Sequence, residues 1–293
     1  MGEGEWFSAF CTELTIGTDK RGSIASRTGR IVGQLNHDLR DLDSKISNRF
    51  YAGSYGRNTA IPSVSDVDVI YELPAALYAR FGGHNGNGQS ALLALVRNCI
   101  LNTYPSSAVT GDGQVVAIHF TDGIRFEVLP AFYNTAGAYT FADSNGGGRW
   151  RECKPRQELD AFSQRNAACN ANLVRLCRMV RAWRDRNDVD MSGMLIDTLA
   201  YQFIATWEHR DKSYVYYDYL TRDFFQYLAG LDLNKAYWQA PGSGSYVNRG
   251  AAFQHKARSA ELRAREAIAF QAANHNWSAR QKYRDIYGTF FPE

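Results

Sequence analysis

The chain has 293 residues, a formal net charge of +3 and 45% hydrophobic residues, which is typical of a globular protein with one large domain or two lobes. The small net charge argues against a protein that coats nucleic acid, and no apolar run approaches the roughly 18 residues that a membrane span needs. The N-terminal segment lacks the pattern of a signal peptide, and the five scattered cysteines favour a reducing compartment over disulfides or structural zinc. We therefore expect a cytoplasmic protein.

Strand patterns and a few helices fill the first half of the chain. Apolar residues at spacings of mostly three, four or seven predict one long amphipathic helix over about residues 23–48. A short strand over RFYAG, the turn GSYGRNTAI and the strand SDVDVIYEL follow. Glycine and asparagine at 82–90 predict a loop, SALLALVRNCILNTY predicts a helix, and QVVAIHFTDGIRFEVLP predicts a β-hairpin.

The second half of the chain is predicted to be helical, starting after NGGGRW at 145–150. SGMLIDTLAYQFIATW and KARSAELRAREAIAFQAANHNWSARQKY have helical patterns, and so does the segment with the apolar stripe Leu173, Leu176, Val180 and Trp183. Residues 151–186 carry nine Arg or Lys side chains against four acids, a surface that suits a polyanionic ligand. A solvated helix face is the simpler explanation until a binding site is found.

Two aspartates, Asp66 and Asp68, interrupt the apolar pattern of SDVDVIYEL. Because side chains alternate along a strand, both carboxylates point to one face, and the flanking valines point to the other. Two unpaired carboxylates buried side by side cost several kcal/mol, which a divalent cation such as Mg²⁺ would offset. The alternative is an exposed edge strand with two solvated acids, which is common for a bare Asp-x-Asp pattern.

The neighbouring segments favour the metal interpretation. The turn at Gly53 and Ser54 is built of small residues that could hold a terminal phosphate. A third acid, Glu127, alternates with Phe126 and Val128 in the strand pattern IRFEVLP. Three acids from two strands beside a phosphate-holding turn predict a two-metal site for phosphoryl transfer.

These motifs resemble those of the DNA-polymerase-β-like nucleotidyltransferases, and more narrowly the bacterial cGAS/DncV-like enzymes, also called CD-NTases or SMODS synthetases. The family patterns GSYxRxT, DhD and FDVVPA resemble GSYGRNT at 53–59, Asp66-Val67-Asp68 and FEVLPA at 126–131. The family helix RLLKAW, the helix start that follows it and the C-terminal segment resemble RMVRAW at 178–183, Ser192-Gly193 and residues 277–292. The matches run in order from residue 50 to the end, and the helix predicted at 23–48 resembles the family's spine helix.

The resemblance implies an α+β, bilobed polymerase-β-like nucleotidyltransferase fold. Residues 1–150 would form the catalytic core, a mixed sheet with the spine helix, and residues 151–293 a helical lobe that closes the nucleotide cleft. The implied metal ligands, for two Mg²⁺ ions that Mn²⁺ can replace, are Asp66, Asp68 and Glu127. The implied phosphate-binding residues are Gly53, Ser54, Arg57, Arg181 and Ser192.

The implied reaction joins NTP substrates into a cyclic di- or trinucleotide by in-line attack of a ribose hydroxyl on an α-phosphate, and pyrophosphate leaves. The product would be a second messenger that activates a downstream effector in bacterial anti-phage (CBASS-type) signalling. The resemblance implies no obligatory nucleic acid and no membrane. Two rival functions stay open. The first is another transferase, which either makes linear oligonucleotides or transfers a nucleotide to another acceptor. The second is a silent nucleotide-binding protein.

The chain departs from the family pattern at two of these positions. The third carboxylate is usually Asp and is Glu127 here, and the extra methylene could shift a metal enough to lower the rate. The family's triphosphate-binding lysine is replaced by Arg181, which keeps the charge and the phosphate contact. RWRECKP at 149–155 resembles the family's lid strand near the bases, so Arg151 and Lys154 are candidates for base reading, although a solvated lysine before a helix is an equal alternative.

Overall fold

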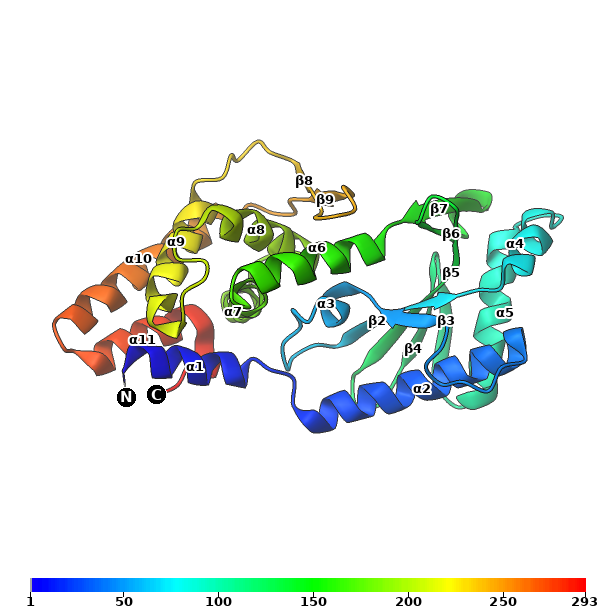
Figure 1. Cartoon of the computed structure of the whole chain (residues 1–293), viewed down its shortest axis with the longest axis horizontal. Helices are drawn as coiled ribbons and strands as arrows, with labels where there is room; N and C mark the ends of the chain where they lie inside the picture. Colours follow the sequence, from blue (N-terminus) through cyan, green and yellow to red (C-terminus); the bar gives the residue numbers. More distant parts are fainter. Residues whose placement is uncertain (1) are drawn as a thin grey trace. The chain divides into compact units, whose positions relative to one another are not determined.

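The computed structural model describes residues 2–293, which form two compact units (Figure 1). The sheet unit comprises Gly17–Gly56 and Ser63–Arg156, and the helical unit comprises the residues up to Ile16, Arg57–Pro62 and Gln157–Glu293. The predicted α+β class, with a mixed-sheet core and a helical C-terminal half, is confirmed. Among residues 2–293, no helix is both long enough and apolar enough to cross a membrane.

The sheet unit is built on a seven-stranded mixed sheet. Five of its strands have the order β1-β2-β5-β4-β3, β6 pairs with β5, and β7 pairs with β6. β2 and β5 run parallel, whereas β1 and β2, and β4 and β5, pair antiparallel. The hairpin predicted in the sequence is therefore confirmed as β4 and β5. The strands are β1 (Arg49–Tyr51), β2 (Asp66–Glu72), β3 (Ala108–Asp112), β4 (Val115–His119), β5 (Arg125–Tyr133), β6 (Tyr139–Asp143) and β7 (Arg149–Cys153).

One face of this sheet is covered by α2 (Thr18–Arg40) and α5 (Gly88–Thr103), which follows α4 (Ala75–Gly82). The alternating apolar residues of β2 and β5 share one buried cluster with apolar residues of both helices; they are Val67, Val69, Phe126 and Val128. Burial of this face fixes the register, because a slip by one residue would turn every side chain to the wrong face. The acids that alternate with these residues must therefore point to the opposite face.

The spine helix is shorter than predicted. It ends at Arg40 rather than near residue 48, and Asp41 follows in the left-handed conformation, with φ of 51°. The side-chain amide of Asn36 donates to the carbonyl of Ser44 at 2.7 Å, which turns the chain back toward the helix end. Ile46 continues the helical spacing of apolar residues, but it is 72% exposed and belongs to a loop.

The helical unit contains most of the helices of the chain. They are α1 (Glu3–Glu13), α6 (Pro155–Ala168), α7 (Asn172–Arg186), α8 (Gly193–Thr206), the 3₁₀ turn η2 (Tyr214–Tyr216), α9 (Tyr217–Ala229), α10 (Gln254–Ala272) and α11 (Asn276–Tyr287). A two-stranded hairpin of β8 (Tyr237–Gln239) and β9 (Tyr246–Asn248) interrupts them. The single long helical pattern at 256–283 is divided where Asn274 adopts a positive φ of 61°.

Two segments from the first half of the chain belong to the helical unit. Helix α1 belongs to the helical unit because Phe7 and Phe10 are fully buried in that unit's core. The Phe7 ring lies 5.0 Å from the Tyr283 ring and 5.2 Å from the Phe291 ring. Residues 57–62, which follow the GSYG turn, also belong to the helical unit.

Candidate active site

The three predicted metal-binding acids lie on one face of the parallel strand pair β2 and β5. Asp68 is directly opposite Glu127, and Asp66 is directly opposite Arg125. Neighbouring residues in a parallel pair point to the same face, so the three carboxylates share the face that α2 and α5 leave uncovered. This register agrees with the predicted alternation, in which Glu127 points away from the face of Phe126 and Val128.

The GSYG turn is attached to the same place on β2. It forms the short helix α3 (Gly53–Gly56), and the amide of Ala52, just before it, donates to the carbonyl of Asp68 at 2.9 Å. Gly53 has a φ of +56°, and a Cβ atom at this position would overlap the carboxylate of Asp68. Only glycine lets the backbone approach the carboxylate this closely. The turn, which includes Ser54, is therefore packed directly against Asp68.

The donor set fits Mg²⁺ in kind, since three carboxylates supply hard oxygen ligands and the glycine at 53 leaves room for the carboxylate of Asp68. One cation of the chain already lies among these acids: Nη1 of Arg125 is 2.7 Å from Oε1 of Glu127. The hydroxyl of Ser65 donates to Asp66 at 3.0 Å. In the part of the chain that the structure describes, no three His, Cys, Asp or Glu side chains converge as a metal cluster. An ion that bound Glu127 would compete with Arg125 for this carboxylate.

Arg57 and Arg181, two of the predicted phosphate-binding residues, are buried in the helical unit around Asp197. Arg181 is 3% exposed, and its Nη1 donates to Oδ1 of Asp197 at 2.5 Å. Arg57 is 8% exposed, and its Nε donates to Oδ2 of the same carboxylate at 2.9 Å. Both are predicted phosphate ligands; the structure shows them in buried ion pairs within the helical unit, and their contact with a phosphate stays a prediction.

No sequence motif points to Asp197, although it is the only charged residue in the apolar helix α8. Its side chain is fully buried. Burial alone would raise the pKa of Asp197, but Arg181 and Arg57 outweigh this effect and lower the pKa to about 2. A lone acid in an apolar helix was the available signal, but its partners are far away in the sequence and could not be identified from spacing.

The remaining candidates lie in different settings. Ser192 is the N-cap of α8, where its hydroxyl accepts from the amide of Leu195 at 3.1 Å, so the structure explains it as a helix cap. Nη1 of Arg151 is 3.6 Å from Oδ2 of the buried Asp143, and the Arg151 side chain is 48% exposed. Lys154 is exposed directly before the start of α6. Contacts of these residues with a nucleotide stay predictions.

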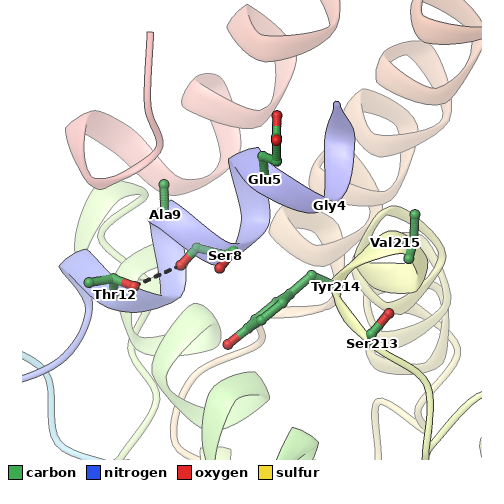
Figure 2. A pocket seen from close by; sticks show the side chains of 8 residues that line it. All are labelled: Gly4, Glu5, Ser8, Ala9, Thr12, Ser213, Tyr214 and Val215. Atoms are coloured by element: carbon green, nitrogen blue, oxygen red, sulfur yellow. Dashed lines mark hydrogen bonds between the residues drawn. The ribbon is translucent and has the colours of Figure 1, made fainter. Parts of the chain in front are cut away.

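A separate groove of about 640 Å³ lies in the helical unit between α1 and η2 (Figure 2). Small and neutral side chains dominate its lining, and Figure 2 shows the hydroxyl of Thr12 directed to Ser8 along α1, where it donates to the Ser8 carbonyl at 2.9 Å. None of the predicted site residues contributes to it. The lining residues are Gly4, Glu5, Ser8, Ala9, Thr12, Ser213, Tyr214 and Val215.

Comparisons with known proteins identify the family of the chain. Residues 1–166, more than half of the chain, match the model of the SMODS family, described as the Second Messenger Oligonucleotide or Dinucleotide Synthetase domain. A probable cyclic nucleotide synthase of Bacillus cereus is 22% identical over 118 residues, which cover 38% of this chain and 34% of that protein. The match thus spans about a third of the length of this curated relative.

Two solved structures show the same fold over nearly the whole chain. E. coli CdnC with ATP is 16% identical, with a TM-score of 0.66 over 100% of this chain and 99% of that chain. The apo form of Vibrio cholerae DncV is 13% identical, with a TM-score of 0.70 over 96% of this chain and 93% of that chain. The fold of this chain thus agrees with both solved structures along nearly its whole length. The family model matches the part of the chain that carries Asp66, Asp68 and Glu127, so the protein belongs to the SMODS family of second messenger oligonucleotide or dinucleotide synthetases.

Proposed function

We propose that this protein is a nucleotidyltransferase that joins NTPs into a cyclic di- or trinucleotide second messenger and releases pyrophosphate. The observation that carries the proposal is the register of β2 and β5, which sets Asp68 opposite Glu127 with Asp66 on the same face. The Gly53–Gly56 turn abuts the carboxylate of Asp68. Membership of the SMODS family and the likeness to CdnC and DncV support the same reaction.

Each residue of this face has a distinct role in the proposal. Asp66 and Asp68 would hold two Mg²⁺ ions, and Glu127 would complete the coordination of one of them. When bound, such ions lower the pKa of the attacking ribose hydroxyl and stabilise the charge that develops on the leaving pyrophosphate. Ser54 and the neighbouring amides would orient the terminal phosphates, so that the α-phosphate is presented to the hydroxyl in line.

The substrates and partners are proposed from the relatives. E. coli CdnC was solved with ATP, so ATP is the first NTP to test. The same protein was solved in a complex with a HORMA protein, and a protein of this kind is a candidate partner here. We propose that the product diffuses to an effector in anti-phage signalling, with no obligatory nucleic acid.

The proposal is tested by incubating the purified protein with the four labelled NTPs and Mg²⁺ or Mn²⁺. Products that resist phosphatase are cyclic and support the proposal, whereas phosphatase-sensitive products identify a linear synthetase. If no product forms, the assay is repeated with a HORMA protein, and binding of a non-hydrolysable ATP analogue is measured. If the analogue binds but neither assay yields a product from the NTPs, the protein is a silent nucleotide-binding protein.

A further inference from the structure

The carboxylate of Asp197 is the centre of a buried network in the helical unit. Its Oδ2 accepts from Nε of Arg57 and from the hydroxyl of Thr59, each at 2.9 Å. Its Oδ1 accepts from Nη1 of Arg181 at 2.5 Å, and Nη2 of Arg181 donates to the carbonyl of Gly193 at 3.1 Å. Both carboxylate oxygens therefore accept hydrogen bonds, and Arg57 and Thr59 belong to the same short segment, 57–59.

A second acid balances the charge of this network. Oε2 of Glu158 lies 3.7 Å from Nη1 of Arg57, and Oε1 of Glu158 accepts from the hydroxyl of Ser243 at 2.7 Å. Two guanidinium groups thus face two acids, and the cluster has no excess positive charge to attract a phosphate. Breaking these buried pairs to reach a ligand would leave Asp197 without its partners, which is strongly unfavourable.

The same segment is fixed from a second helix. Nη2 of Arg178, on α7, donates to Oδ1 of Asn58 at 2.7 Å, and its Nε donates to the Asn58 carbonyl at 3.0 Å. Asn58 has a positive φ of 59°, which side-chain contacts of this kind help to hold. Three successive residues, 57 to 59, are therefore held by charged side chains of α7 and α8, immediately after Gly56 ends the GSYG turn.

We infer that Asp197 is a positioning residue for the proposed nucleotidyl transfer. By holding Arg57 and Thr59, it fixes the segment into which the Gly53–Gly56 turn continues along the chain, and so restrains the C-terminal end of that turn. Arg57 and Arg181 are then partners of Asp197 rather than phosphate ligands. The inference rests on the proposed function for its consequence on rate, but the anchoring of residues 57–62 can be measured independently.

The test compares Asp197→Asn with Glu261→Gln. Glu261 is a matched control, because it is a buried acid of the same unit with two arginine partners, Arg258 and Arg265. Asp197→Asn should accelerate amide hydrogen exchange of residues 53–62 and lower kcat about 10- to 100-fold, with KM for ATP changed much less, because a small misplacement acts on the chemical step. Glu261→Gln should lower Tm without either effect.

A double variant separates positioning from stability. In Asp197→Asn with Arg181→Met, one of the two guanidinium groups that lose the carboxylate is removed, so Tm should recover in part while kcat stays low, because Arg57 and Thr59 still lack the carboxylate. If Asp197→Asn does not fold, Thr59→Val tests the same anchor alone. The inference is overturned if exchange of residues 53–62 is unchanged, or if kcat recovers together with Tm. If the wild type makes no product, the proposed function fails while the exchange experiment still decides the anchor.

Discussion

Asp68 and Glu127 are register partners on the parallel strands β2 and β5. Oε1 of Glu127 also lies 2.7 Å from Nη1 of Arg125, on its own strand. The pairing sets the third acid of the site beside the Asp-x-Asp motif despite its extra methylene. The longer side chain gives Glu127 two accessible partners, a metal ion on the shared face and the guanidinium of Arg125. The competition between these two partners is the physical basis for the prediction on metal preference below.

Replacing both aspartates, as Asp66→Asn with Asp68→Asn, should abolish product formation and leave the fold intact. Like charges on one face repel each other, so the Tm of the metal-free protein should be equal to or higher than that of the wild type. Product is measured with labelled NTPs and Tm by thermal unfolding. Undiminished synthesis would contradict the assignment of these residues to the metals.

The control for this variant is Asp41→Asn with Asp43→Asn. These residues form a second Asp-x-Asp pattern, in an exposed segment after α2. Asparagine tolerates the left-handed conformation of Asp41, so the fold should not change. Synthesis by this control should equal that of the wild type, which would show that the position of the carboxylates matters and not their number.

Glu127→Gln should be inactive, and Glu127→Asp should keep measurable activity with a smaller preference for Mn²⁺ than the wild type. Mg²⁺ demands nearly ideal octahedral geometry, and a longer, adaptable ligand that also pairs with Arg125 makes the wild-type site less ideal. The measurement is the ratio of rates with Mn²⁺ and Mg²⁺ for each variant. In a nucleotide-bound crystal structure with metal, a Glu127 carboxylate more than about 4 Å from either ion would show that another residue completes the site, since Mg²⁺ ligands lie at about 2.0–2.1 Å.

Gly53→Ala should abolish synthesis, because the new Cβ would overlap the carboxylate of Asp68. The control is Gly146→Ala, at a glycine with a similar φ of +60° whose added Cβ would meet only open space. Both variants carry the strain of a left-handed residue, about 1–2 kcal/mol, so both should lower Tm. Loss of activity in Gly53→Ala alone would isolate the close approach to Asp68, and equal activity of the two variants would contradict it.

Alternation and local spacing carried most of the prediction of the site. The buried valines of β2 and the phenylalanine and valine of β5 determine which face the acids occupy, so Asp66, Asp68 and Glu127 could be grouped from the sequence. The environment of Arg57 and Arg181 could not, because their common partner Asp197 is 140 residues from Arg57 along the chain. The end of α2 was also missed, since Ile46 continues the apolar spacing after the left-handed Asp41 has stopped the helix.

The N-terminal helix should make stability depend on pH through Glu3. This side chain is partly buried and accepts from the amide of Gln271 at 2.5 Å; burial first, and then the neighbouring Asp218, raise its pKa from 4.5 to about 7. A carboxyl whose pKa is higher in the folded protein stabilises the fold fully below the unfolded pKa, and this contribution is lost as pH rises through about 7. Tm should therefore fall between about pH 5 and pH 8.

Glu3→Gln keeps an amide–amide hydrogen bond and should flatten this dependence, with a higher Tm than the wild type at about pH 8. Glu5→Gln, at an exposed position of the same helix, should keep the wild-type profile. Thermal unfolding across this pH range decides the matter: a Glu3→Gln protein whose Tm falls as steeply as that of the wild type would assign the pH dependence to other groups, first of all Asp218.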